Sequence, residues 1–311
     1  MKISYNNREY AMPDVLFAGA PKSGTTSLYH YLHASPELFF TQVKEPHFFS
    51  FFGNKPNFKS PERLPTVVAD IEKYSAFFKQ ANEGQLLAEA SQSYMFMNQE
   101  LIANAKKLYG DEAKNIKVVL VLRNPIDRAW SQYWHFKKNY NEPLEFEEAI
   151  SEEVLKQRKE DNWNVFYQYL DFGNYSEQIT ILRTAFPKLK IYLFDDLKAK
   201  PQSILDDICD FLGIAYVSAN FDKKFNPSGK PKQDIFGRLW QLNTRFEFLR
   251  PIKRLLPYKF RKGLSNALLE RALEPQHMPV AQREFLKGHY RAEIIQLSKL
   301  LNRQEILQWL D

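Results

Sequence analysis

The sequence has little that points to a membrane-spanning or an oxidised, secreted protein. Among its 311 residues there is a single cysteine, Cys209, so an intrachain disulfide is excluded and we expect a buried packing role for its thiol. No stretch approaches the ~18 consecutive apolar residues that a membrane-spanning helix needs. The first residues also lack the basic segment followed by an apolar one that marks a secretory signal. These absences predict a cytoplasmic protein without disulfide staples.

The pattern of apolar residues indicates an α/β fold. Hydrophobic residues make up 44% of the chain, and no Gly/Ser/Pro-rich linker or internal repeat divides it. Short apolar runs typical of strands alternate with helical stretches, as a mostly parallel sheet requires. The expected strands are 15–19, 85–89, 117–122 and 190–194, and the expected helices are 25–33, 98–109, 126–138, 144–159, 174–186, 201–212 and 281–301. We predict a single domain over 1–311 with a P-loop-type, mostly parallel sheet flanked by helices and a helical, basic appendage at 232–280.

The balance of charge is basic, with a formal net charge of +6 and a pI near 9.1. Such a balance suits anionic ligands in general, nucleic acid included. The densest basic cluster, 246–262, is interleaved with aromatic and aliphatic residues, which favours a helical appendage with an apolar inner face. Peripheral contact with an anionic membrane or an anionic acceptor is the alternative for this cluster. We expect no nucleic-acid partner.

A phosphate-binding turn is predicted where the first strand ends. The run Ala20-Pro21-Lys22-Ser23-Gly24-Thr25-Thr26 follows that strand and opens a helix. Backbone N–H groups of such a turn and the positive end of the helix dipole converge on a terminal phosphate or sulfate. Gly19 and Gly24 keep the spacing of an NTPase loop, but Thr25 stands where that loop has its lysine, and the turn's lysine is Lys22. A P-loop kinase or NTPase is therefore an alternative with a broken signature.

A second anion site is predicted at the end of the strand 117–122. Arg123-Asn124-Pro125 follows this run of β-branched and apolar residues, and the proline can open the next helix. Ser131 then lies two turns into that helix, about 9 Å along its axis. An arginine fork and a hydroxyl can together clamp one phosphate monoester. Two anion sites at carboxyl ends of parallel strands predict a nucleotide with phosphates at two separate positions.

These two motifs resemble those of the sulfotransferases that use 3′-phosphoadenosine 5′-phosphosulfate (PAPS). The run 20–26 is similar to their 5′-phosphosulfate loop, and Arg123-Asn124-Pro125-Ile126-Asp127-Arg128-Ala129-Trp130-Ser131 is similar to their 3′-phosphate motif. The resemblance implies PAPS as cosubstrate, held by Lys22, Ser23, Gly24, Thr25, Thr26 and Ser27 at one end and by Arg123 and Ser131 at the other. It covers essentially the whole chain and is weakest over 53–85.

The acceptor side resembles the heparan-sulfate type of this family. Lys44-Glu45-Pro46-His47-Phe48-Phe49 is similar to its Glu-x-His-Phe-Phe segment, in which the glutamate is the catalytic base, and 89–94 is similar to its acidic Ser-Pro-x-Tyr loop with Gln92 in place of the proline. A basic turn at 223–232 is similar in kind to the loop that closes over the nucleotide, which implies Ser228, Gly229 and Lys230 as further nucleotide contacts.

The resemblance implies a sulfuryl transfer from PAPS to a hydroxyl, or an amine, of a carbohydrate, lipid or other small acceptor. Lys22 is expected to stabilise the charge that develops on the leaving bisphosphate, and Glu45 to remove the acceptor proton. His47 is the alternative base, or it orients Glu45 or the acceptor. The six histidines show no metal-ligand spacing, so no metal is expected. A catalytically silent nucleotide-binding protein is a further alternative.

Overall fold

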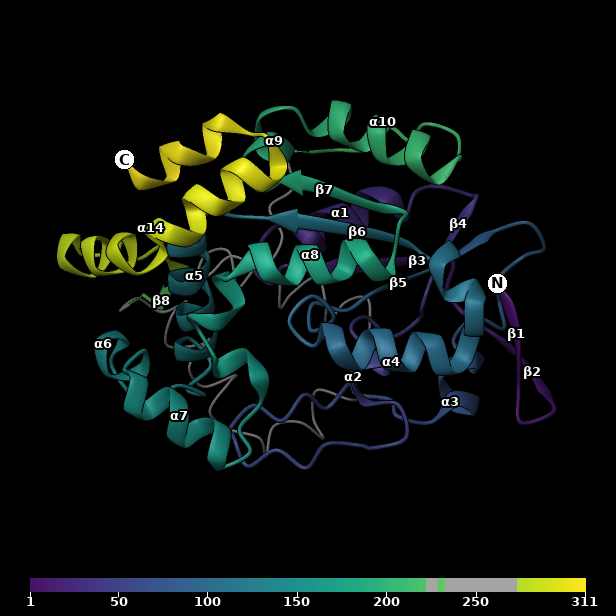
Figure 1. Ribbon diagram of the computed structural model, residues 1–311, viewed down its shortest axis with the longest axis horizontal. Coiled ribbons are helices and arrows are strands. Elements are labelled where there is room, and N and C mark those ends of the chain that lie inside the picture. Colours follow the sequence, from purple (N-terminus) through teal and green to yellow (C-terminus); the bar gives the residue numbers. More distant parts are fainter. Residues whose placement is uncertain (222–228, 233–272) are drawn as a thin grey trace.

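A five-stranded sheet, in which every neighbouring pair of strands is parallel, organises the protein (Figure 1). The computed structural model describes residues 1–221, 229–232 and 273–311. The strand order is β4-β5-β3-β6-β7, so the chain enters the sheet at the central strand, forms the edge strand β4 and then β5 between them, and adds β6 and β7 on the other side. The strands are β3 (Val15–Gly19), β4 (Leu38–Phe40), β5 (Leu86–Ala90), β6 (Lys117–Leu122) and β7 (Leu189–Leu193).

Helices cover both faces of this sheet. Side chains alternate along each strand, so Val15 and Phe17 face one apolar cluster and Leu16 and Ala18 the other. The first cluster is completed by α1 (Thr25–Leu32), α9 (Phe194–Ala199) and α10 (Pro201–Leu212). The second is completed by α4 (Asn98–Tyr109), α5 (Pro125–Lys137), α8 (Tyr175–Ala185) and α14 (Val280–Leu301). Figure 1 shows α10 on one side of the sheet and α4 and α8 on the other.

Helix α5 begins directly at the edge of the sheet because its first residues stop the strand and cap the helix. The side chain of Asn124 accepts a hydrogen bond of 3.0 Å from the backbone N–H of Ile126, and Pro125 occupies the first helical position, where no N–H is needed. This abrupt turn holds Arg123 at the end of β6 and places Ser131 on the first turns of α5.

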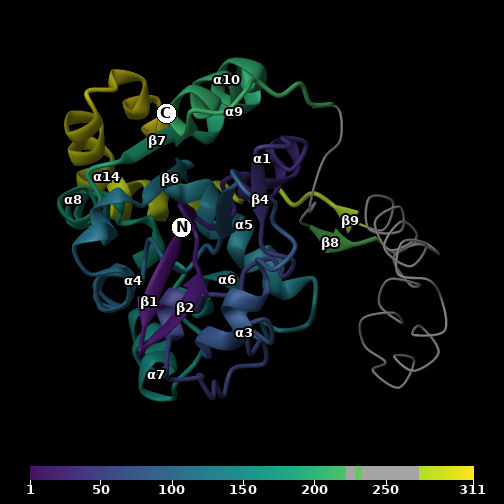
Figure 2. The ribbon, with the colours of Figure 1, turned by 90° about the vertical axis from the view of Figure 1, so that its right-hand side faces the viewer.

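The shorter elements surround this core. A hairpin of β1 (Lys2–Tyr5) and β2 (Arg8–Ala11) turns through Asn6 and Asn7, both with positive φ, and lies beside α3 (Ile71–Ala76) in Figure 2. A second antiparallel pair is β8 (Lys230–Pro231) with β9 (Leu273–Glu274). The remaining short helices are α2 (Phe48–Phe51), α6 (Phe146–Ala149), α7 (Glu152–Glu160), η1 (Gly110–Asn115), η2 (Val165–Tyr167), η3 (Asp171–Gly173) and η5 (Gln304–Leu310).

The predicted α/β fold with a mostly parallel sheet is confirmed, and the four expected strands fall within one residue of those observed. Two expectations need correction. The sequence reasoning missed β4, and the expected helix 144–159 is divided into α6 and α7, because the hydroxyl of Ser151 accepts from the backbone N–H of Val154 and caps a new helix that begins at Glu152. Most of the predicted appendage at 232–280, with the basic cluster 246–262, lies outside the described residues, and Leu273–Glu274 within it form a strand.

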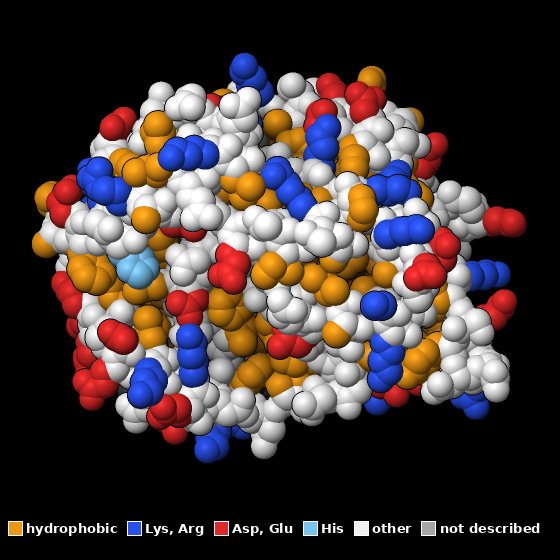
Figure 3. All heavy atoms as spheres, viewed as in Figure 1, with side chains coloured by type: hydrophobic (Ala, Val, Ile, Leu, Met, Phe, Trp, Pro, Cys, Tyr) orange, Lys and Arg blue, Asp and Glu red, His pale blue; other side chains and the backbone are white. Residues whose placement is uncertain are grey.

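Charges of both signs are interspersed over the face that Figure 3 shows, where lysine and arginine side chains alternate with acidic ones. The excess of basic residues therefore does not form one continuous basic surface on this face. Apolar side chains lie between the charged ones across the same view.

Candidate active site

The predicted site residues meet in a cavity of about 830 Å³ at the carboxyl ends of the sheet strands. Its lining includes Lys22, Glu45 and His47, and the nucleotide-side residues Gly24, Thr25, Thr26, Ser27, Arg123 and Ser131. Ser23 is not among the lining residues. Its side chain is buried, and its hydroxyl lies 3.5 Å from the carbonyl oxygen of Pro21. Lys230 is the first residue of β8 and Gly229 precedes it; neither residue lines the cavity. Ser228 lies outside the described residues.

The loop after β3 presents the start of α1 to the cavity without a blocking side chain. Gly24 is the N-cap of α1 with φ 84°, and no side chain there accepts from the first helical N–H groups. A Cβ on this residue would lie 2.8 Å from the ring of Phe194, so both the positive φ and the close approach require glycine. The first N–H groups of a helix are uncapped donors at the positive end of its dipole, and here the residues that carry them line the cavity.

Lys22 carries its ammonium group into a cationic part of this cavity. Its backbone also has a positive φ of 65°, and its carbonyl oxygen accepts a 3.0 Å hydrogen bond from Nη1 of Arg123. Burial, followed by the nearby charges of Lys138 and Arg123, lowers the pKa of Lys22 to about 7, against a smaller opposing effect of Glu45. Burial and the neighbouring cations thus destabilise the charged form of Lys22 in the free protein, and an anion bound beside it would relieve this.

Arg123 has hydrogen-bond donors available for a ligand. Its guanidinium lies 5.2 Å from the ring centroid of Phe194, and among the described residues its only acceptor is the Lys22 carbonyl. Burial lowers the pKa of Arg123 from its ordinary value, but an arginine stays charged at neutral pH. Ser131, buried on α5, lines the same cavity. The arginine fork and this hydroxyl therefore border one space, as the sequence predicts.

Glu45 is tied to the phosphate-binding loop through its neighbour Lys44. The Glu45 backbone has a φ of 58°, and its N–H donates to the carbonyl oxygen of Ala90 at 3.2 Å. Its Oε1 accepts from Nε2 of Gln92 at 2.8 Å and lies 3.2 Å from Nζ of Lys44, which donates to the Thr26 hydroxyl at 2.6 Å. Oε2 has no partner among the described residues, so one carboxylate oxygen is held while the other is available to an acceptor.

His47 is a neutral, fully buried imidazole that lines the cavity. Burial lowers its pKa to about 4. Its Nδ1 lies 2.8 Å from the hydroxyl of Ser93, and its backbone N–H donates to the hydroxyl of Ser91 at 2.9 Å. Nε2 has no hydrogen-bond partner among the described residues, and His47 lines the cavity, so this nitrogen can pair with a bound acceptor. An imidazole with so low a pKa is a poor proton acceptor at neutral pH.

A buried carboxyl group helps to fix the segment that carries Glu45 and His47. Glu89, at the end of β5, accepts hydrogen bonds of 2.6 Å from the hydroxyls of Tyr74 and Tyr94 and another from Ser91. Burial raises the pKa of Glu89 to about 7, although the three hydroxyl donors act in the opposite direction. Because Ser91 also accepts from the His47 backbone, Glu89 fixes the position of His47 through one hydroxyl.

The structure adds residues that the predicted site did not include. Lys44 and Gln92 both contact the Glu45 carboxylate, and His135 lines the cavity with a buried Nδ1 that has no partner among the described residues. Burial and the charges of Lys22 and Lys138 lower the pKa of His135 well below its usual range. A signal for His135 was present, since it lies four residues after Ser131 and therefore on the same helix face.

Within the described ranges, no group of three or more histidine, cysteine, aspartate or glutamate side chains could hold a metal ion. The helices placed by the structure include none that is both long and apolar enough to cross a bilayer.

Known proteins match this chain over most of its length. The family model of the sulfotransferase domain matches residues 12–228. The membrane-associated sulfotransferase kil1 of Dictyostelium discoideum is 25% identical in an alignment of length 288, which covers 66% of this chain and 57% of that protein. The bifunctional heparan sulfate N-deacetylase/N-sulfotransferase 3 of Mus musculus is 24% identical over 313 residues, covering 96% of this chain and 31% of that protein. The chain thus spans less than two thirds of the length of either relative.

A solved structure shares the fold. The crystal structure of a sulfotransferase from Alicyclobacillus acidocaldarius superposes with a TM-score of 0.67 at 22% sequence identity, covering 94% of this chain and 97% of that one.

Proposed function

The chain belongs to the sulfotransferase family, and from this premise we propose that it transfers the sulfuryl group of PAPS to a hydroxyl of a carbohydrate-type acceptor, with Glu45 as general base. One observation carries the proposal. A single cavity holds a carboxylate with one free oxygen, a lysine with a strongly lowered pKa and an arginine with free donors, on the carboxyl side of a parallel sheet.

The described residues fit the proposed nucleotide at both of its charged ends. The uncapped start of α1 and Lys22 supply N–H groups and positive charge for the 5′-phosphosulfate, and Arg123 with Ser131 supplies a fork and a hydroxyl for the 3′-phosphate. The low pKa of Lys22 supports the assignment, because negative charge bound beside it restores the charged ammonium form.

The chemistry asks the protein for positioning and charge stabilisation. Glu45 takes the proton of the acceptor hydroxyl through Oε2, and the acceptor oxygen forms its bond to sulfur as the bond from sulfur to the bridging phosphate oxygen breaks. Lys22 faces the negative charge that grows on that oxygen. Lys44 bridges Glu45 and Thr26, so it holds the base at a fixed place relative to the phosphate-binding loop.

His47 has a different role in this proposal. With a pKa of about 4 it stays neutral, and its Nε2 donates to or accepts from the acceptor without taking its proton. The His47 ring is fixed by Ser93 on its other nitrogen, so it orients the acceptor toward Glu45.

A carbohydrate acceptor is supported by the name of one relative, the heparan sulfate enzyme of mouse, and by the aliphatic hydroxyl chemistry that a glutamate base suits. Neither a lipid nor an amine acceptor has a specific observation of its own in the cavity.

Calorimetry with nucleotides tests the proposal. The protein should bind 3′,5′-bisphosphoadenosine at least about tenfold more tightly than AMP or ATP, without divalent metal, because only the bisphosphate fills both anion sites. The exposed variant Lys79→Ala serves as a control for loss of general positive charge and should bind as the unmodified protein does. Equal affinity for AMP and the bisphosphate would remove the assignment of the 3′-phosphate to Arg123.

A further inference from the structure

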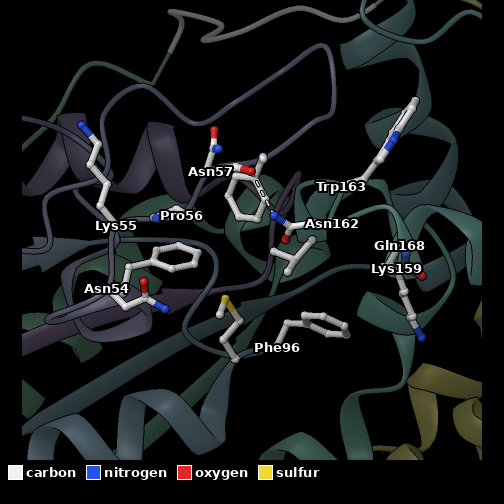
Figure 4. A pocket seen from close by; sticks show the side chains of 13 residues that line it. Asn54, Lys55, Pro56, Asn57, Phe96, Lys159, Asn162, Trp163 and Gln168 are labelled. Atoms are coloured by element: carbon white, nitrogen blue, oxygen red, sulfur yellow. Dashed lines mark hydrogen bonds between the residues drawn. The ribbon is translucent and has the colours of Figure 1, made fainter.

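A second cavity, of about 520 Å³, is separate from the one that holds Glu45 (Figure 4). We call it the aromatic-amide pocket. Three segments far apart in the sequence form it. They are 51–58 from the end of α2 onward, residues 96–97 before α4, and 159–168 from the end of α7 to the residue after η2. None of its lining residues lines the cavity that holds Glu45.

The floor of the aromatic-amide pocket is apolar and rigidly packed. Phe51 and Phe58 meet edge to face at 5.8 Å between ring centroids, in one buried cluster that Met97 packs against. The ring of Phe96 is stacked on Phe172 with centroids 4.2 Å apart. The floor thus offers aromatic surfaces whose orientation is fixed before any ligand binds.

The walls carry amide groups. Nδ2 of Asn162 donates a 2.9 Å hydrogen bond to the carbonyl oxygen of Asn57, and Figure 4 shows this pair across the cavity from Phe96. Gln168 is 3% exposed; its Nε2 donates to the carbonyl oxygen of Leu155 at 3.1 Å, but its Oε1 is buried and has no partner in the part of the chain that the structure describes. A buried amide oxygen in a lined cavity needs a donor, and a ligand hydroxyl can supply one.

We propose that the aromatic-amide pocket binds a sugar ring of the acceptor, remote from the ring that receives the sulfuryl group. The C–H face of a pyranose carries partial positive charge and packs on aromatic faces, while its hydroxyls pair with amides. A hydrocarbon would leave Oε1 of Gln168 without a donor and would cover the side-chain amide of Asn57 without pairing it, which is unfavourable. Lys55 at the mouth has no acidic partner among the described residues, so a ring with an acidic substituent is also accommodated.

The position of the pocket suits a second ring of a chain, and in this the inference rests on the proposed function. Helix η2 separates the two cavities: Phe166 lines the active-site cavity and contacts His47 edge to face at 5.8 Å, while Val165 and Gln168 line the aromatic-amide pocket. Helix α2 likewise begins beside His47 and ends at Phe51. An acceptor held at both places has its binding energy supplied away from the reacting atoms.

The test blocks the pocket from its exposed rim. Asn57→Trp places a large ring over the cavity and leaves the backbone carbonyl that pairs with Asn162 in place, and Asn82→Trp makes the same change at an exposed asparagine outside both cavities. Saturation-transfer NMR measures binding of heparosan, chondroitin, chitin and cellulose tetrasaccharides to each protein saturated with 3′,5′-bisphosphoadenosine. Calorimetry of the bisphosphate reports separately on the nucleotide site.

We expect at least one tetrasaccharide to bind the unmodified protein and Asn82→Trp alike, and to bind Asn57→Trp about tenfold more weakly, with bisphosphate affinity unchanged in all three. The side-chain amide signal of Gln168 should shift on binding. Unaltered tetrasaccharide affinity in Asn57→Trp, or no binding of any of the four by the unmodified protein, overturns the subsite. If the unmodified protein does not bind the bisphosphate, or does not transfer the sulfuryl group of PAPS in a separate activity assay, the proposed function is refuted instead. The two failures are therefore distinguishable.

Discussion

The low pKa of Lys22 makes nucleotide affinity depend on pH in a defined direction. At pH 7 about half of the Lys22 side chains in the free protein are charged, because burial and neighbouring cations bring the pKa to about 7. A bound phosphosulfate or phosphate favours the charged form, so the pKa of Lys22 rises on binding and the complex takes up a proton. Affinity should therefore be highest below pH 7 and fall as pH rises above it.

The expected slope can be worked out from one proton. Where the free lysine is neutral and the bound one charged, each pH unit costs up to about tenfold in affinity, or ~1.4 kcal/mol. The phosphates of the ligand lose their last proton near pH 6, so they add little opposing slope above pH 7. Lys138, whose pKa burial lowers to about 8, can steepen the fall only above that pH.

Calorimetric titration with 3′,5′-bisphosphoadenosine between pH 6.5 and 9 measures this slope. Lys22→Met keeps the length and apolar part of the side chain but cannot take up a proton, so its affinity at pH 7 should be lower and nearly flat up to pH 8. Repeating the titrations in buffers of different ionisation enthalpy counts the protons directly. An unmodified protein with flat affinity over this range, or a Lys22→Met variant with the same slope, would refute the reasoning.

Two further predictions concern Arg123, at the proposed 3′-phosphate site, and Glu89, the buried carboxyl group that helps to fix His47. Arg123→Ala should weaken bisphosphate binding by ~1.5–3 kcal/mol and leave AMP binding nearly unchanged, whereas the exposed control Arg8→Ala changes neither; calorimetry with both ligands checks this. Glu89→Ala should lower the free energy of unfolding by ~1–3 kcal/mol for each tyrosine hydroxyl left without an acceptor, measured by urea denaturation. The folded-state pKa of Glu89, about 7, lies above its ordinary 4.5, so relative to Glu89→Gln the unmodified protein should lose stability as pH rises through that window. The buried neutral His47 and His135 act in the opposite direction in both proteins and cancel in this comparison. The same pH dependence of stability in both proteins would contradict the assignment.

The central part of the fold could be predicted because its signals are local. The run 15–19 is apolar throughout and 117–122 is apolar after Lys117, as strands buried on both faces must be, and they were located to the residue. By contrast, β4 has three residues, and it is a strand only because it pairs with β5. The hairpin β1–β2 was also missed, although Asn6-Asn7 between short alternating runs is a turn signal.

The site shows the same division between local and long-range information. The residues that converge on the anion sites belong to contiguous motifs, so their approach follows from strand ends meeting at one edge of the sheet. The bridge from Glu45 through Lys44 to Thr26, and the contact of Gln92 with the same carboxylate, depend on the path of a loop between elements. No periodicity encodes such a path, and the aromatic-amide pocket, built from three distant segments, lay beyond sequence reasoning for the same reason.

Sulfuryl transfer itself is the most direct test of the account, with Glu45 as the residue to change. The protein and its Glu45→Gln variant are incubated with sulfur-labelled PAPS and unsulfated heparosan, and labelled product is counted after separation. The account predicts transfer by the unmodified protein and a turnover lowered by ~10²-fold or more in Glu45→Gln, with bisphosphate affinity retained, since the amide keeps the size of the side chain but cannot take the proton. Full turnover by Glu45→Gln, or its persistence beside an inactive His47→Ala with intact nucleotide binding, would contradict the role of Glu45 as the base.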